Sequence, residues 1–538
     1  SVSGKNIIAN DPHLAFQAPG KFMFSVIRSN GWNGEGFSIP GLPAFIIGKN
    51  ENIAWVLTNV MADDADFYTE QFDSIKTKYL VNGKWRDLNI EQDTIYIKDS
   101  SPFIYSIKKT HRGPIVSEVH SFSNANTYDK SNISMRWTAL DVTDEIFAFA
   151  SINRASNWKE FKNGVKYFTA PGQNFVYGDK DGNIGYICGA KLPMRKTNSP
   201  TLVYDGTTDK YDWQGYVPFD KMPMLYNPRN NFIASANNKT IKNYPYHISN
   251  LWEPESRIKR ITELLNSKEK HSVSDFKIYQ NDFFSYQAKD ITPFILQAFE
   301  NVTVKEENLN TALSLLKQWD FVVDKKSQTP SIFNEFFQHL MKNIFLDEMG
   351  EELFNEYIFV ANIPYRKVKE MLHNNNSAWW DNVKTEKRET REEIIRLSLV
   401  EALASLESKL GEDLAFWQWQ ELHTVTFKHM FSLSSPMLGN ILNIGPFPIG
   451  GDGTTIFNTE YSLTKPYENK LGPALRFIFD FAEPDYVNFI LPTGQAGYFM
   501  SPHYSDLTDK WLNGEYLRIN INTSDINSRN YDLLKLTN

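Results

Sequence analysis

The chain has 538 residues, of which 41% are hydrophobic and 22% charged, as expected for a globular protein with room for more than one domain. Its net charge of −8 argues against a nucleic-acid-binding protein, because such proteins carry a basic excess or stripe. The single cysteine, Cys188, excludes a disulfide framework and a thiolate metal cluster, and its strand-like surroundings predict a core residue. No apolar segment approaches the roughly 18 residues of a membrane span, so we expect no membrane insertion.

The chain begins with Ser1 instead of methionine. If this start is natural, Ser1 carries both a hydroxyl and a free α-amino group, which titrates at about pH 8. One residue could then act as nucleophile and base together. The alternative is that Ser1 only marks where a fragment begins, and the residue alone favours that alternative.

The first part of the chain predicts strands joined by tight turns. Short runs rich in β-forming residues predict strands at 7–9, 22–28, 44–47, 53–58, 79–81, 96–98 and 103–108. We interpret the glycines at 31, 34 and 36, and the segment 48–50, as turns. Asn82-Gly83 predicts a two-residue hairpin turn, and 174–186 predicts a second hairpin. Helical spacing appears only at 144–168 in this part.

From about residue 256 the pattern becomes helical. Apolar periodicity predicts helices at 257–265, 273–284, 291–299, 308–319, 332–346, 365–372 and 389–410. Gly411 is well placed to end the last of these. Strands return at 475–481 and 486–491. We therefore predict an α+β protein with three parts: 1–255 as the first part of a β-rich core, 256–434 as a helical excursion, and 435–538 as the completion of the core.

Several sequence blocks, in order, match a known family. They are Ala-Asn-Asp-Pro-His-Leu at 9–14, Pro-Gly-Leu-Pro at 40–43, 47–60, 173–186, Ala-Asn-Asn at 236–238, Trp-Trp-Asp at 379–381, 417–423 and 494–504. On these blocks the chain resembles the β chain of the penicillin acylase family, which belongs to the N-terminal nucleophile hydrolases. The resemblance runs from the first residues to about 516.

The resemblance implies a four-layer αββα sandwich and a precursor that cleaves itself into two chains. The partner would be a separate α chain, in a periplasmic or secreted heterodimer. It also implies an amidohydrolase that acts on N-acyl amides through an acyl-enzyme on an N-terminal serine.

The family's catalytic positions fall on Ser1, His13, Asn59 or Val60, Asn237 and Arg257. Ser1 would attack the carbonyl, and its own amine would accept the proton. The side-chain amide of Asn237 and a backbone N–H at Asn59 or Val60 would bind the oxyanion. Arg257 matches an arginine beside the catalytic asparagine. His13 matches a histidine near the nucleophile in the lactone- and cephalosporin-acylase branches. Without the resemblance, we would read Asn237 as a turn residue, Arg257 as solvated and His13 as packed in the core.

The start of the chain departs from the family pattern. The family usually opens Ser-Asn-x-Trp, whereas this chain opens Ser-Val-Ser-Gly and reaches His13 early. Either family residues are missing, ahead of Ser1 or near Lys5-Asn6, or this is a shortened member. In the first case Ser1 is not the nucleophile.

The resemblance also implies an acyl pocket and a metal site. Leu14, Ile47, Leu57, Phe149 and Gln173 match pocket positions, although core packing is the alternative for the apolar four. Leu57 replaces a smaller residue of the penicillin G type, so a linear acyl group is as plausible as phenylacetyl.

A structural Ca²⁺ would bind Asp63 and Asp66 with the backbone oxygens of Ala65 and Pro200. A further family carboxylate has no counterpart, because His247 and Ile248 lie there. The alternative is a solvated acidic turn.

Other functions remain open. An acyl-homoserine-lactone acylase would use the same chemistry with a different pocket. A catalytically inactive, secreted binding member of the family is a second alternative, favoured by the short start and opposed by Asn237. The 14% aromatic content would suit a carbohydrate-binding protein, but no motif supports it.

Overall fold

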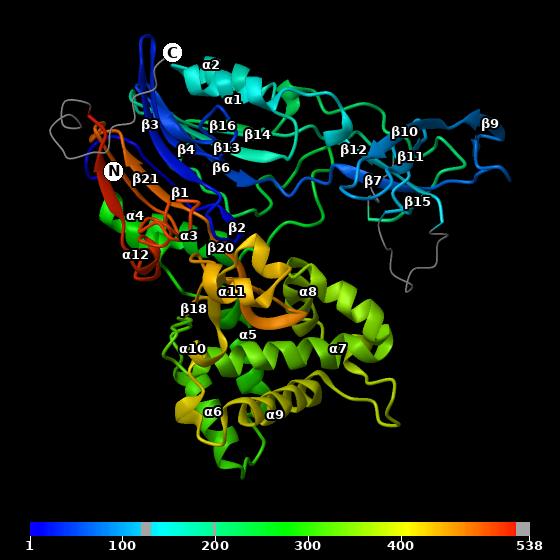
Figure 1. The fold of residues 1–538 in the computed structure, drawn as a ribbon. Coiled ribbons are helices and arrows are strands. Elements are labelled where there is room, and N and C mark those ends of the chain that lie inside the picture. Colours follow the sequence, from blue (N-terminus) through cyan, green and yellow to red (C-terminus); the bar gives the residue numbers. More distant parts are fainter. Residues whose placement is uncertain (120–130, 197–200, 523–538) are drawn as a thin grey trace.

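Two β-sheets packed face to face form the centre of the molecule. The computed structural model describes residues 1–119, 131–196 and 201–522 (Figure 1). The larger sheet has the order β16 (Met224–Tyr226), β14 (Ile184–Gly189), β13 (Gln173–Asp179), β6 (Ile53–Asn59), β5 (Ile47–Asn50), β4 (Trp32–Ser38) and β3 (Met23–Ser29). The smaller sheet has the order β1 (Ile7–Asn10), β21 (Arg476–Asp480), β22 (Tyr486–Ile490) and β23 (Leu517–Asn520).

Aromatic side chains hold the two sheets together. Phe37 of β4 is fully buried and meets Phe477 of β21 and Phe489 of β22 edge-on, with ring centroids 5.7 and 5.5 Å apart. Phe24 of β3 stacks on Phe489 at 4.2 Å. Such pairs contribute about 0.5–1.5 kcal/mol each beyond their buried area, so they favour this one alignment of the sheets.

Helices cover the outer faces of both sheets. On the larger sheet, α1 (Glu145–Arg154) and α2 (Trp158–Val165) bury Phe149 and Phe161 against Phe175 of β13. Beside the smaller sheet lie α3 (Ser256–Asn266), α4 (Val273–Gln280) and α12 (Thr508–Leu512), with α4 packed on β21 (Figure 1). The layers therefore follow the predicted order α, β, β, α.

A separate helical lobe has its own core (Figure 1). It contains α5 (Tyr286–Phe299), α6 (Glu307–Gln318), α7 (Thr329–Phe359), α8 (Asn362–Leu372), α9 (Arg391–Leu410) and α10 (Trp419–Leu422). The longest helix, α7, is kinked at Gly350 and packs on α9. A capping box of Thr390 and Glu393 begins α9, and Gly411 at φ 90° ends it, which confirms the predicted stop.

A third sheet joins the lobe to the sandwich. It contains β17 (Thr424–Phe427), β18 (Ile444–Pro448), β19 (Glu460–Ser462) and β20 (Lys465–Pro473), with α11 (Pro436–Leu442) between β17 and β18 in the chain. The short strand β2 (His13–Ala15) pairs with β20, opposite residues 471–473. The bounds of β17, β18, β19 and β20 were not predicted from the sequence.

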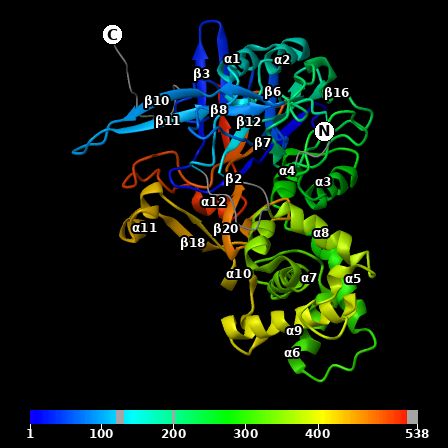
Figure 2. The same cartoon turned by 90° about the vertical axis from the view of Figure 1, so that its right-hand side faces the viewer.

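Smaller β elements extend from the side of the sandwich that lies away from β1 and β21 (Figure 1). A three-stranded sheet contains β12 (Ile133–Trp137), β7 (Ala65–Thr69) and β15 (Tyr204–Asp205). The hairpin of β8 (Lys78–Val81) and β9 (Lys84–Asp87) turns at Asn82-Gly83, as predicted. A second hairpin, of β10 (Asn89–Ile95) and β11 (Phe103–Lys109), extends away from the body of the molecule (Figure 2).

Three local predictions are wrong. Gly34, Gly36 and Gly48 lie within paired strands and not in turns. A Cβ on Gly36 would stand 2.3 Å from the Ile47 carbonyl oxygen, and one on Gly48 2.5 Å from the Glu35 oxygen, so glycine permits the close approach of β4 and β5. In addition, the strand predicted at 44–47 begins only at Ile47, and residues 96–98 lie in a loop after β10.

Cys188 is a core residue, as predicted. It is a free, buried thiol on β14, and burial raises its pKa to about 12. Within the described residues, no helix combines the length and apolarity needed to span a membrane.

One buried histidine makes the stability of the fold depend on pH. His423 is fully buried, and its Nδ1 lies 2.7 Å from the Tyr467 carbonyl oxygen. Burial lowers its pKa to about 4, from an ordinary value of 6.5. The unfolded chain therefore binds this proton at higher pH than the folded chain, and the free energy of unfolding must fall as pH drops from 6.5 to 4.

Between pH 6.5 and 4, we expect the free energy of unfolding of His423→Asn to fall by about 3 kcal/mol less than that of the parent chain. The measurement is urea unfolding of both proteins across this pH range. His503→Asn is the matched control, because that imidazole is 71% exposed. Equal pH slopes for the His423 variant and the parent chain would contradict the assignment.

Candidate active site

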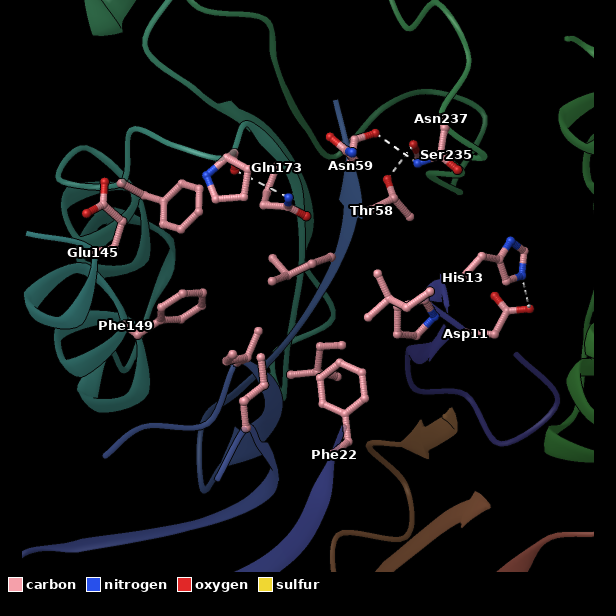
Figure 3. A pocket seen from close by; sticks show the side chains of 18 of the residues that line it. Asp11, His13, Phe22, Thr58, Asn59, Glu145, Phe149, Gln173, Ser235 and Asn237 are labelled. Carbon is pink, nitrogen blue, oxygen red and sulfur yellow. Dashed lines mark hydrogen bonds and ion pairs between the residues drawn. The ribbon is translucent and has the colours of Figure 1, made fainter. Parts of the chain in front are cut away.

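A cavity of about 520 Å³ opens at the ends of β2, β6 and β13 (Figure 3). Polar side chains gather on one side of it, and they include Asp11, His13, Asn59 and Asn237. The rest of the wall is mostly apolar, although Glu145 and Gln173 also line it (Figure 3). Its apolar part is formed by Leu14, Phe22, Ile39, Leu42, Ile46, Ile47, Leu57, Ile146, Phe149 and Phe168.

Asn237 is held in one orientation by its neighbours. Its Oδ1 accepts a hydrogen bond from Arg257 Nη2 at 3.1 Å, and its Nδ2 donates to the Asn59 carbonyl oxygen at 2.9 Å. A guanidinium only donates, so this contact identifies the oxygen of the amide. The backbone of Asn237 is left-handed, with φ 60°, a conformation that asparagine adopts more readily than most residues.

The edge of β6 distinguishes the two predicted backbone donors. The N–H of Val60 donates to the Gly172 carbonyl at 3.0 Å and is therefore engaged. Strand alternation turns the N–H of Asn59 to the opposite edge, the same edge on which Leu57 N–H donates to Asn10 Oδ1 at 3.2 Å. That edge borders the cavity, and Asn59 lines it, whereas Val60 is not among the lining residues.

His13 lies between a cation and a carboxylate. Its Nδ1 is 3.3 Å from Arg257 Nη1, and its Nε2 is 3.5 Å from Asp11 Oδ2. Burial lowers the pKa of His13, the charges of Arg257 and Arg476 act in the same direction, and Asp11 opposes them. Because the guanidinium donates, Nδ1 is the acceptor and the proton of the neutral ring stands on Nε2, facing Asp11.

Arg257 connects these groups and is not solvated. It lies at the start of α3, is 6% exposed, and contacts both Asn237 and His13. Glu253 lies 3.8 Å from it on the side away from His13, and burial raises the pKa of that carboxyl.

Ser1 lies outside this cavity. Its hydroxyl contacts Ser3 Oγ at 2.8 Å and the Lys5 carbonyl, and it borders a separate small cavity with Asn6 and His271. Ser3 in turn donates to Asp480 at 2.9 Å, which anchors the start of the chain at the far end of β1. An extended strand then separates Ser1 from His13, so the structure does not bring the predicted nucleophile to Asn237.

All five predicted acyl-pocket residues line the cavity: Leu14, Ile47, Leu57, Phe149 and Gln173. The Gln173 amide donates to the Pro171 carbonyl at 3.3 Å. The remaining four present only carbon to the cavity, so this side is suited to an apolar acyl group.

Sequence reasoning missed a hydroxyl pair and an acid in the wall. Thr58 Oγ1 and Ser235 Oγ are 2.7 Å apart, and Asn174 Nδ2 donates to both. This contact ties the loop that carries Asn237 to β6. Asp11 and Thr58 stood within quoted family blocks, although neither was given a role, whereas no pattern in the sequence marked Ser235.

The predicted metal ligands lie away from the cavity, around the start of β7. Asp63 and Asp66 form ion pairs with Arg195, which the sequence analysis did not single out. Ala65 begins β7 opposite Trp137. Pro200 lies outside the described residues. With a guanidinium already between the two carboxylates, the residues present do not fit a bound Ca²⁺.

The chain is similar to known acylases over most of its length. The profile of the family described as penicillin amidase matches residues 1–528. The acyl-homoserine lactone acylase QuiP of Pseudomonas aeruginosa is 28% identical over 96% of this chain and 65% of its own length, so the chain spans about two thirds of that relative. The penicillin G acylase of Escherichia coli is 30% identical over 49% of this chain and 31% of its own.

A solved structure extends the likeness to the whole fold. The thermostable penicillin G acylase from Alcaligenes faecalis superposes with a TM-score of 0.76 at 20% identity, covering 100% of this chain and 98% of that one. This likeness confirms the predicted N-terminal nucleophile hydrolase fold. Taken with the profile match over nearly all its residues, it shows that the chain belongs to the penicillin amidase family.

Proposed function

We propose that the chain is the β-chain-like part of an N-acyl amide hydrolase. The observation that carries the proposal is the convergence of Asn237 Nδ2 and the Asn59 edge of β6 at the mouth of an apolar cavity. Donors of this kind stabilise the oxyanion of a tetrahedral intermediate, and the apolar wall would hold the acyl chain.

The reaction would proceed through an acyl-enzyme. A hydroxyl attacks the amide carbonyl, the amine leaves with a proton, and water then releases the acid. We assign the attack to the N-terminal serine of the mature protein, with its α-amine as the base. For Ser1 itself to act, residues 1–6 would have to leave the position that the Ser3–Asp480 contact gives them. A sulfonyl fluoride adduct located by mass spectrometry would identify the residue.

The heterodimer is also a proposal. A relative named penicillin acylase 2 proenzyme, from a Pseudomonas species, is 24% identical over 95% of this chain and 64% of its own length. The unmatched third of such relatives has room for the α chain of a common precursor. We propose that this α chain is the partner.

An acyl-homoserine-lactone acylase is the substrate variant that the cavity favours. The wall of the cavity is lined mainly by aliphatic side chains. Leu57 narrows the cavity at a position where acylases of the penicillin G type have a smaller residue. The relatives named acyl-homoserine lactone acylase match 96% of this chain. A linear acyl chain therefore fits the proposal better than phenylacetyl.

Asn237→Ala tests the oxyanion assignment. We expect kcat for an N-acyl amide to fall by about 10²–10³-fold with KM little changed, because the donor acts in the transition state. The measurement is steady-state hydrolysis by the mature protein. Asn238→Ala is the matched control, since the neighbouring amide bonds to Lys239 and Ala236 and does not line the cavity. An Asn237 variant as active as the control would remove Asn237 from the mechanism.

Fatty-acid binding tests the acyl pocket without requiring turnover. Each added methylene should tighten Kd about fourfold until the cavity is filled, because burying a CH₂ contributes about 0.8 kcal/mol. Calorimetric titration with linear acids of increasing length measures this. Leu57→Phe should weaken the longer acids by about tenfold.

The control for this prediction is Val56→Ala, which changes the adjacent residue on the opposite face of β6. That variant should keep the chain-length dependence. Affinity independent of chain length, or phenylacetic acid binding more tightly than every linear acid, would contradict the proposed pocket.

A further inference from the structure

The carboxylates of Asp63 and Asp66 enclose one of the chain's own cations. Arg195 Nε donates to Asp66 Oδ2 at 2.7 Å. Its Nη2 donates to the carbonyl oxygen of Asp63 at 3.1 Å and to Asp63 Oδ1 at 3.2 Å. The Arg195 side chain is 3% exposed and that of Asp66 is fully buried, so little water reaches the pair.

Two further side chains bind the same carboxylates. His247 Nε2 lies 3.0 Å from Asp63 Oδ2, and Trp213 Nε1 donates to Asp66 Oδ2. Three of the four carboxylate oxygens are therefore bonded to nitrogen groups of the protein. The fourth, Asp66 Oδ1, is buried and makes no hydrogen bond to the part of the chain that the structure describes. Calcium requires six to eight oxygen ligands. The geometry around these carboxylates is that of an arginine site.

The charge at this position is permanent. An arginine side chain stays protonated throughout the pH range in which proteins fold, and Arg195 lies within hydrogen-bond distance of both carboxylates. A Ca²⁺ placed between the same carboxylates would meet this positive charge at close range. Guanidinium and metal ion therefore compete for one place.

We propose that Arg195 and His247 together replace a metal cation between Asp63 and Asp66, so that this junction is stable without calcium. The junction fastens three loops to Asp63, in the segment between β6 and β7, and to Asp66 in β7. Arg195, Trp213 and His247 each come from a different loop, and Asp63 N–H donates to the Ile248 carbonyl at 2.7 Å. The segment follows directly after Asn59, so the contact that replaces the metal also supports that end of β6.

The first test uses the unmodified full chain. Protein freed of loosely bound ions by gel filtration is assayed for calcium by mass spectrometry, and its Tm is measured in EDTA and in millimolar calcium. We expect substoichiometric calcium and the same Tm in both solutions. Bound calcium near one per chain, or a Tm that rises with calcium, would overturn the proposal.

The second test restores a metal site. Arg195→Gln with His247→Asp removes the internal cation and supplies a third carboxylate, so its Tm should rise by roughly 3 °C or more in millimolar calcium. Arg195→Gln with His247→Asn is the matched control, because it loses the same two side chains without adding a carboxylate, and its Tm should not respond.

A carboxylate variant that ignores calcium would show that these aspartates do not form a cation site, and the proposal would fail. If neither double variant folds, the calcium content and Tm of the unmodified chain still decide. All readouts are metal content and unfolding, so they are independent of whether the protein hydrolyses amides.

Discussion

The candidate site depends on a buried amide that joins the two sheets. Asn10, at the end of β1, is 5% exposed; its Nδ2 donates to the Leu57 carbonyl at 3.0 Å and its Oδ1 accepts from the Leu57 N–H at 3.2 Å. An unpaired amide in this interior would cost about 1–3 kcal/mol, so the alignment that satisfies both groups is strongly preferred. His13 follows Asn10 by three residues and Asn59 follows Leu57 by two. The amide therefore sets the distance between the two strands that carry the polar wall.

Asn10 fixes the relative position of two strands through the backbone of Leu57, and Arg257 fixes the positions of two side chains at the site. One guanidinium bonds Asn237 Oδ1 and His13 Nδ1, and as a group that only donates it determines the orientation of both partners. Burial is the main cause that lowers the pKa of His13, and the charge of Arg257 acts in the same direction. A lysine would offer no planar fork with two separate donors at this geometry. The same guanidinium thus orients both polar side chains and disfavours a positive charge on the imidazole.

The sequence predicted elements whose signals are local. The α9 stripe, its Gly411 stop and the Asn82-Gly83 turn all follow from the residues themselves. β18 and β20 were missed because their residues are polar or include proline and glycine, and their extended form depends on pairing with β17, β19 and β2. Site residues such as Asn237 and Arg257 could be predicted because they match positions of the family. Arg195 could not, because its role depends on Asp63 and Asp66, which are about 130 residues away in the chain.

The orientation of Asn237 leaves it able to serve a reacting carbonyl. A side-chain amide has two Nδ2 hydrogens, and one is directed at the Asn59 carbonyl. That bond and the Arg257 contact hold the amide plane at both ends before any substrate arrives. The second hydrogen is consequently positioned at no further entropic cost, which is the condition under which an oxyanion donor lowers a barrier most. The left-handed backbone at Asn237, with φ 60°, places the side chain between these two partners, and a residue with a branched Cβ would adopt this conformation only with strain.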